Sequence, residues 1–249
     1  MTSSRTDVYA EPSRPALPGS GFRLEPARTA LVVTDPQIDF LSPDGATWEI
    51  FGASITDNET VLHIGQLLEA AKAADVAVAI SPHYYYPSDD AWRFGGPLEQ
   101  YMHDVSMFSR RGPLTLDGFE GSGADFLPAY REHILDGRTA VASPHKIVGP
   151  ESNDLVLQLR KRGVSQVLLA GMAANLCVEG HLRELVEQGF EVVVVRDATA
   201  GPRLPEGDGY LSALINFRYL AAATWTTAEA VEALAGSLAS SSPVKDAAS

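Results

Sequence analysis

The sequence contains a single cysteine, Cys177, among 249 residues. One cysteine cannot form a disulfide bond within the chain, so this kind of covalent stabilisation is excluded in the monomer. Basic residues are also scarce, with 19 lysines and arginines against 32 acidic residues and a formal net charge of −13. Because surfaces that bind nucleic acids or anionic membranes need positive charge, this balance argues against both kinds of partner.

Long hydrophobic runs and glycine-rich phosphate loops are missing as well. No apolar run approaches membrane-spanning length, and the first residues lack the apolar core of a secretion signal. No Walker or dinucleotide glycine pattern precedes a helix, which disfavours nucleotide chemistry, and we predict no cofactor. With 45% hydrophobic and 20% charged residues, the chain is expected to be a cytoplasmic globular protein of enzyme size.

The hydrophobic pattern alternates between short buried runs and segments of helical spacing. Strands are expected at residues 30–34, 76–80, 139–142, 166–170, 191–196 and 221–225, and helices at 58–74, 152–162, 176–188, 208–219 and 227–238. Alternation of this kind predicts an α/β fold with a doubly wound, mainly parallel sheet that is covered by helices on both faces.

We expect one domain, at residues 23–238. Residues 1–22 are rich in serine, proline and glycine and are predicted to form a flexible arm or a strap over a neighbouring subunit, and residues 239–249 a flexible tail. The long aromatic loop at 81–138, which contains Tyr84, Tyr85, Tyr86, Trp92 and Phe94, is expected to wall a pocket or to cover a subunit interface. A homo-oligomer, either a dimer or a tetramer, is the expected assembly.

Cys177 lies where the strand at 166–170 passes into a helix. Asn175 is the expected N-cap of that helix and Gly189 its stop, which places the thiol in the first turn. Unpaired N–H groups and the helix dipole at this position lower the pKa of a thiol and provide donors for an oxyanion. The position is typical of a nucleophile, although a lone cysteine is equally common as a small buried hydrophobe.

Two charged residues follow other predicted strands. Asp35 comes directly after the strand at 30–34, and Lys146 follows the strand at 139–142. Because the carboxyl ends of parallel strands share one edge of a sheet, Asp35, Lys146 and Cys177 are expected to converge there. A carboxylate can take the thiol proton and return it to a leaving group, and a nearby cation favours the thiolate.

Three segments resemble the isochorismatase-like cysteine hydrolases. They are TDPQIDFL at 34–41, AGMAANLCVEGHL at 170–182 and VVVVRDATAG at 192–201, with the lysine after the third strand as a further match. This superfamily includes nicotinamidases, N-carbamoylsarcosine amidohydrolase, ureidoacrylate amidohydrolases and isochorismatases. The resemblance covers residues 30–225 and implies a six-stranded parallel sheet.

The resemblance also implies a role for each site residue. Asp35 corresponds to the acid/base, Lys146 to the supporting cation and Cys177 to the nucleophile. The Met172–Ala173 peptide bond is expected to be cis, and the N–H groups of Ala173 and Cys177 are expected to form the oxyanion hole. The implied activity is hydrolysis of a C–N bond in a small non-peptide amide, ureide or imide, through a thioester.

The metal-binding pattern of nicotinamidases is not matched. Where that pattern has Asp-x-His, this chain has Ser81-Pro82-His83, followed by Asp89 and Asp90 and no clear second histidine. One imidazole with two loop carboxylates is a weak metal site, so no metal is predicted. The substrate pocket is expected to include Phe40, His83 and Trp92.

Two histidines near the expected site are given no catalytic role. His181, one helical turn beyond Cys177, is interpreted as structural, and His145 is expected to point away from the side of the chain that Lys146 occupies. Two alternatives to the amidohydrolase remain. One is an isochorismatase-type enol-ether hydrolase that needs Asp35 and Lys146 but tolerates loss of the thiol, and the other is a non-catalytic interaction module on the same fold.

Overall fold

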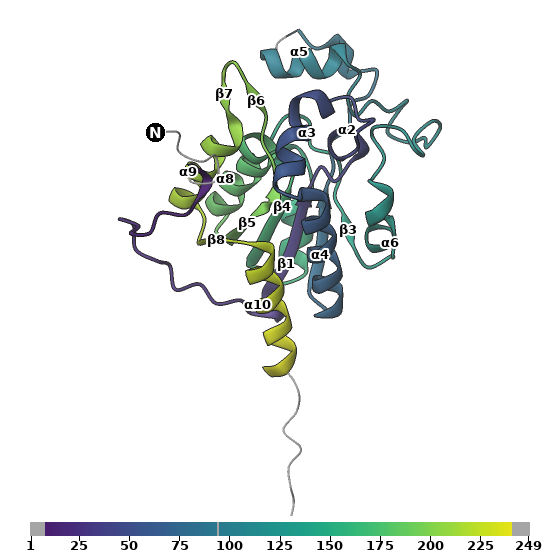
Figure 1. Ribbon diagram of the computed structural model, residues 1–249. Helices are drawn as coiled ribbons and strands as arrows, with labels where there is room; N and C mark the ends of the chain where they lie inside the picture. The colour runs from purple at the N-terminus through teal and green to yellow at the C-terminus, as the bar shows by residue number, and fades with distance from the viewer. Residues whose placement is uncertain (1–7, 94, 241–249) are drawn as a thin grey trace, which may run out of the picture.

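A computed structural model describes residues 8–93 and 95–240, and its core is one parallel β-sheet (Figure 1). The sheet has six strands in the order β3-β2-β1-β4-β5-β8, and every neighbouring pair is parallel. The strands are β1 (Thr29–Thr34), β2 (Ala77–Ser81), β3 (Ala140–Val141), β4 (Gln166–Gly171), β5 (Glu191–Thr199) and β8 (Ala223–Trp225). The predicted fold class and number of strands are confirmed.

Helices cover both faces of the sheet. Leu31 and Val33 of β1 pack in one hydrophobic cluster with α4 (Thr60–Ala73) and α10 (Thr227–Ser240). Ala30 and Val32 point to the other face and pack with α7 (Leu155–Lys161), α8 (Glu179–Glu187) and α9 (Gly209–Leu220). Because both faces are buried, every residue of β1 and β4 is buried and their sequences lack the alternation of a half-exposed strand.

The order of the strands reverses between β1 and β4. From β1 the chain builds outward through β2 to β3, and from β4 it builds in the opposite direction through β5 to β8. In open α/β sheets, the crevice at the carboxyl ends of the two strands at such a reversal is the usual ligand site. Asp35 follows β1 and Cys177 follows β4, so both residues lie at this crevice.

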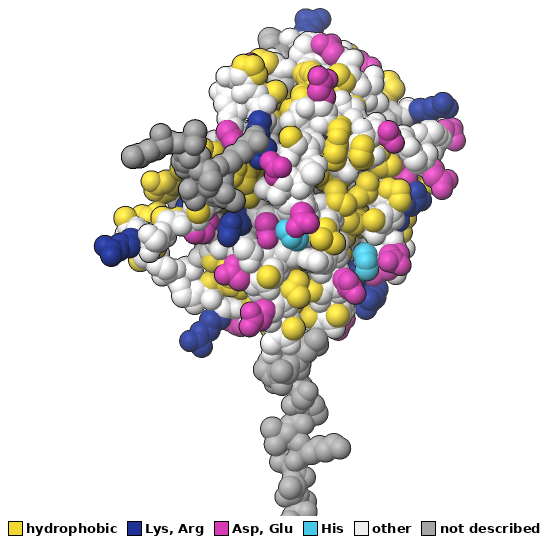
Figure 2. Space-filling model, in the orientation of Figure 1, with side chains coloured by type: hydrophobic (Ala, Val, Ile, Leu, Met, Phe, Trp, Pro, Cys, Tyr) yellow, Lys and Arg dark blue, Asp and Glu magenta, His cyan; other side chains and the backbone are white. Residues whose placement is uncertain are grey.

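Several helices lie in segments for which the sequence analysis predicted none. They are α2 (Ile38–Leu41), α3 (Trp48–Asp57), α5 (Pro97–Asp104) and α6 (Arg131–Ile134), with short 3-10 helices at Pro26–Arg28, Asp89–Ala91, Pro128–Tyr130 and Pro150–Ser152. Figure 2 shows hydrophobic side chains gathered over α3, α4 and α6, where Trp48, Leu62 and Tyr130 line a shallow surface depression. A short antiparallel pair, β6 (Arg203–Leu204) and β7 (Gly207–Asp208), precedes α9.

The N-terminal arm contacts its own chain. The ring of Tyr9 packs against Tyr210 of α9 and its hydroxyl donates to Asp208, while Arg218 donates a hydrogen bond of 2.9 Å to Glu11. Residues 8–22 of the predicted arm therefore lie along the domain, whereas its residues 1–7, and residues 241–249 of the tail predicted at 239–249, fall outside the described residues. Among residues 8–93 and 95–240, no helix combines the length and the apolar character that crossing a bilayer requires.

Candidate active site

Asp35 is held at the end of β1 by its backbone. It is fully buried, its φ of 47° lies in the left-handed region, and its N–H donates to the carbonyl of Ser81. On the other side of β1, Gly171 ends β4 with a φ of 111° so close to Thr34 that a Cβ atom would overlap the Thr34 carbonyl oxygen. The two strands therefore end side by side, and the segments that follow them meet.

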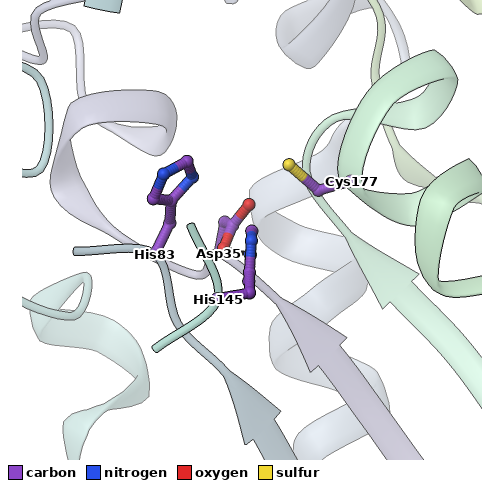
Figure 3. A group of neighbouring side chains, drawn as sticks. All are labelled: Asp35, His83, His145 and Cys177. Carbon is purple, nitrogen blue, oxygen red and sulfur yellow. Dashed lines mark hydrogen bonds and ion pairs between the residues drawn. The ribbon is translucent and has the colours of Figure 1, made fainter. Parts of the chain in front are cut away.

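Four buried side chains meet at this edge of the sheet: Asp35, His83, His145 and Cys177 (Figure 3). One nitrogen, oxygen or sulfur atom of each lies within 4.8 Å of those of the other three. The residues follow β1, β2, β3 and β4, which are adjacent strands. The predicted convergence of Asp35 and Cys177 is confirmed. Their neighbours in the cluster are His83 and His145, and not the predicted Lys146.

The two oxygens of Asp35 have different surroundings. Oδ1 accepts a hydrogen bond of 2.8 Å from Nε2 of His145, and both side chains are fully buried. Oδ2 is buried and has no hydrogen-bond partner among the described residues, and the Cys177 thiol lies beside this carboxyl group. The carboxylate is therefore oriented by one oxygen and free to accept a proton at the other.

Lys146 does not join the cluster, so the prediction that its ammonium group supports Cys177 is wrong in geometry. Its Nζ atom donates to Asp89 Oδ2 at 2.6 Å and to the Tyr84 carbonyl at 2.8 Å. The same Nζ lies 4.0 Å from the centroid of the Tyr86 ring, a cation–π contact. His145, which was expected to point away, takes the position next to Asp35 instead.

The register of two neighbouring segments explains this exchange. His83 and His145 form an isolated parallel bridge beyond the ends of β2 and β3, so their side chains point to the same face. Because side chains alternate along an extended chain, Lys146 points to the opposite face. The sequence does carry a signal for this pairing: Ser-Pro-His occurs twice, at 81–83 and at 143–145, once after each strand.

Cys177 lies in η5, a π-helical turn at Ala174–Val178 that leads directly into α8. Asn175 is inside this turn, and its predicted role as the N-cap is wrong, because Ala173 occupies that position. The Met172–Ala173 peptide bond is cis, as the resemblance implied. The backbone N–H groups of Ala173 and Cys177 both lie within reach of the sulfur and favour its charged form, as an oxyanion hole beside the nucleophile requires.

The electrostatic state of the thiol differs from the expectation. Burial, followed by the negative charge of Asp35, raises the pKa of Cys177 well above its ordinary value, and the two N–H groups only partly offset this. The expected lowering by a helix dipole and a lysine is therefore wrong. In the resting site Cys177 is therefore a protonated thiol, and the Asp35 carboxylate is placed to remove its proton.

His181 fixes the turn that carries Cys177. Asn153 donates to the Ser81 hydroxyl at 2.8 Å, so that hydroxyl donates its own hydrogen to Nε2 of His181 at 2.7 Å. The His181 Nδ1–H then donates to the Cys177 carbonyl at 2.7 Å. Burial, and next the nearby His145, lower the pKa of His181 to about 3, so the ring is neutral. The interpretation of His181 as structural is supported by these contacts.

His83 is a buried member of the cluster. Gln37 holds its backbone, since the His83 N–H donates to Gln37 Oε1 and the Gln37 amide donates to the His83 carbonyl, both at 2.9 Å. The ring packs on Tyr85, Phe108 and His145, and neither ring nitrogen has a hydrogen-bond partner among the described residues. Burial, followed by His145, lowers the pKa of His83 well below its ordinary value.

The other predicted pocket residues lie farther out. Phe40 packs edge-on against Phe51 and Phe108, which places it in the core behind His83. Trp92 is 42% exposed and lines a cavity of about 490 Å³ with His103 and acidic residues of the 81–138 loop. The Tyr85 ring contacts both Trp92 and His83, and none of the four cluster residues lines this cavity. Phe94 lies outside the described residues.

The weak metal site considered in the sequence is not assembled. Asp89 binds Lys146, and although burial alone would raise the pKa of Asp89, the hydrogen bonds from Lys146 and from the Tyr86 N–H lower it overall. Asp90 is exposed and lies 3.4 Å from His103. Both carboxylates are therefore paired with side chains other than His83.

Comparisons with known proteins find curated relatives of this chain. The chain is 28% identical over 205 residues to ureidoacrylate amidohydrolase RutB of Methylobacterium radiotolerans, which covers 77% of this chain and 73% of that protein. It is also 28% identical over 209 residues to RutB of Pseudomonas syringae pv. syringae, covering 79% of this chain and 81% of the relative.

Solved structures share the fold. A cysteine hydrolase from Pseudomonas syringae pv. phaseolicola superposes with a TM-score of 0.69 at 22% identity, covering 89% of this chain and 99% of the other. N-carbamoylsarcosine amidase from Thermoplasma acidophilum superposes with a TM-score of 0.59 at 19% identity, covering 80% and 96%. The Isochorismatase domain matches residues 29–229, from the first strand of the sheet into the last helix, and the chain therefore belongs to the isochorismatase family.

Proposed function

We propose that this protein is a hydrolase that cleaves a C–N bond in a small ureide or amide, with Cys177 as the nucleophile. The observation that carries the proposal is the state of Asp35: Oδ1 is bound by His145, Oδ2 has no hydrogen-bond partner among the described residues, and the carboxylate lies in one buried cluster with the thiol. The relatives named ureidoacrylate amidohydrolase support a ureide as the substrate class.

The first half-reaction forms a thioester. Asp35 Oδ2 takes the proton of Cys177 as the sulfur attacks the substrate carbonyl carbon, and the N–H groups of Ala173 and Cys177 bind the resulting oxyanion. Asp35 then donates this proton to the leaving nitrogen, the C–N bond breaks, and an amine or ammonia departs. In the second half-reaction Asp35 takes a proton from water, the hydroxide attacks the thioester, and the proton returns to the sulfur.

A raised thiol pKa is compatible with this sequence of steps. The proton leaves the sulfur only when the carbonyl carbon is close enough to accept the sulfur electron pair, so no free thiolate accumulates. His145 keeps Asp35 in place through the 2.8 Å hydrogen bond, and it takes the third position of the triad, where the sequence analysis expected Lys146 as a cation supporting the thiolate. The triad that we propose is therefore Asp35, His145 and Cys177, with His145 as a positioning residue.

Hydrolysis of a panel of small ureides, amides and cyclic imides tests the proposal, with ureidoacrylate included. Wild-type protein should hydrolyse at least one ureide or amide, and Cys177→Ala should lose that activity. Full activity of Cys177→Ala would contradict the thioester route and favour the enol-ether alternative. A wild-type protein that turns over no compound of the panel would contradict the proposed function.

Four expectations from the sequence remain proposals. They are a cytoplasmic location, a homo-oligomeric assembly, a small molecule as the only partner class, and a single domain at residues 23–238. Size-exclusion chromatography with light scattering tests the assembly, and limited proteolysis tests the domain boundaries.

A further inference from the structure

The cluster at the strand ends contains more unsatisfied polar atoms than acid–base chemistry requires. Four of its buried atoms have no hydrogen-bond partner among the described residues: Asp35 Oδ2, both ring nitrogens of His83, and His145 Nδ1. Burying such an atom without a partner is destabilising, because the atom loses its hydrogen bonds to water. The proposed mechanism uses Asp35 Oδ2 and leaves His83 without a function.

The chemistry of these side chains is that of a metal site. Asp35, His83, His145 and Cys177 supply one carboxylate oxygen, two imidazole nitrogens and one sulfur, all within 4.8 Å of one another. In tetrahedral zinc sites with bonds of about 2.0–2.3 Å, the ligand atoms lie about 3.3–3.8 Å apart. Closing the cluster by about 1 Å through side-chain rotation therefore brings four ligands around one ion.

The balance of charge also suits a divalent cation. Asp35 contributes one negative charge and Cys177 a second after losing its proton, while the two imidazoles bind metals in their neutral form. An ion with two positive charges makes the assembled site neutral, and a neutral site avoids the penalty of a net charge in a buried place. Exposed fractions of 0%, 1%, 0% and 4% for Asp35, His83, His145 and Cys177 show how completely it is shielded.

We propose that Asp35, His83, His145 and Cys177 form a zinc-binding site that, when filled, blocks the nucleophile. Binding replaces the S–H bond of Cys177 by a bond to Zn²⁺ and releases one proton to solvent, with no change of oxidation state. The ion binds the Cys177 sulfur and the Asp35 carboxylate at the same time, so neither can act on a substrate. The inhibitory consequence rests on the proposed hydrolase function, whereas the binding itself does not.

Zinc binding is measured on the full-length chain without substrate. After treatment with a chelator and a reductant, the protein is dialysed against buffered Zn²⁺ and the bound metal is counted by mass spectrometry. We expect one Zn²⁺ per chain for the wild type, at least about tenfold weaker binding for His83→Gln, and unchanged binding for the control His133→Gln. His133 lies on α6 away from the cluster and pairs with Glu132.

Co²⁺ gives a second readout that does not depend on affinity alone. A Co²⁺–thiolate bond produces a charge-transfer absorption band in the near ultraviolet, which we expect in the wild type and not in Cys177→Ser. Mg²⁺, which prefers oxygen ligands, should not compete. Equal zinc affinity in His83→Gln and His133→Gln, an unchanged Co²⁺ band in Cys177→Ser, or competition by Mg²⁺ would each overturn the site.

Inhibition is tested last, on a substrate that the panel identifies. Added Zn²⁺ should abolish hydrolysis by the wild type, and a chelator should restore it. Full activity with one Zn²⁺ bound would refute the blocking role. Failure of the protein to hydrolyse any compound leaves the zinc titration and the Co²⁺ spectrum as independent results, so the two proposals fail separately.

Discussion

Replacing His145 and Lys146 in separate variants tests which of these neighbouring residues supports the base. The His145 Nε2–H bond to Asp35 Oδ1 is 2.8 Å long between two fully buried side chains. The Lys146–Asp89 pair is 2.6 Å long, but its side chains are 22% and 10% exposed. The two contacts are similar in length and differ in their access to water.

The expected magnitudes follow from that difference. Removing one partner of a buried ion pair or charged hydrogen bond costs about 3–5 kcal/mol. His145→Ala leaves the Asp35 carboxylate without the donor that orients it, and kcat/KM should fall by about 10²- to 10⁴-fold. Lys146→Ala breaks a solvent-screened pair worth at most about 1 kcal/mol, and Tm should fall by about 2–4 °C.

The assay combines initial rates on the best substrate of the panel with urea unfolding of each variant. His145→Gln is included because its amide N–H can still donate to Asp35 and should retain the fold if His145→Ala does not. An activity loss in Lys146→Ala that equals or exceeds the loss in both His145 variants would refute the assignment. Such a result would restore the lysine to the role that the family resemblance implied.

Three further perturbations test the charge beside Cys177, the pH dependence of stability and the close approach of β1 and β4. Asp35→Asn removes a charge that raises the pKa of Cys177, so we expect faster iodoacetamide labelling at pH 8 together with lost hydrolysis; slower labelling would contradict this electrostatic account. His83 and His181 have lowered pKa values in the folded protein, so the unfolded chain binds protons that the native state does not. Stability should therefore decrease as pH falls below about 6.5, and His181→Gln should show about 1.4 kcal/mol less pH dependence between pH 7.5 and 5.5 in urea unfolding. Gly171→Ala places a Cβ against β1 at a φ of 111° and should lower the Tm strongly, whereas Gly163→Ala, at an open position with a φ of 74°, measures the cost of the positive φ alone; equal losses would show that the close approach is not the cause.

The sheet was predictable because its strands are short, fully apolar runs that end at polar residues. Thr29–Thr34 and Gln166–Gly171 are buried on both faces, and their length and branched residues distinguish them from helices. The helix Trp48–Asp57 was missed because its hydrophobic residues follow a glycine- and proline-containing segment that favours a loop. Loop conformation between Ser81 and Arg138 depends on tertiary contacts, such as the Asp39 carboxylate that binds the Phe108 N–H, which no local pattern encodes.

Within the site, the sequence could not fix the pairing of two extended segments to within one residue. Placing Asp35 and Cys177 at one edge needed only the order of elements, whereas choosing between His145 and Lys146 needed the pairing of two short extended segments. A shift of one residue in an extended chain turns every side chain to the other face. The pKa of Cys177 was predicted in the wrong direction because burial and the Asp35 charge raise it, while the lysine expected to lower it lies on the other side of the chain and binds Asp89.

The contacts of the N-terminal arm have a practical consequence for preparing the protein. A shortened protein that begins at β1 would keep the whole sheet. It would, however, lack Tyr9, which packs on Tyr210, and Glu11, which binds Arg218. It would also uncover apolar surface along α9 and β8, where residues 15–22 now lie. Purification handles are better joined ahead of Met1, and a truncated version that precipitates should not be taken as evidence that the domain itself is unstable.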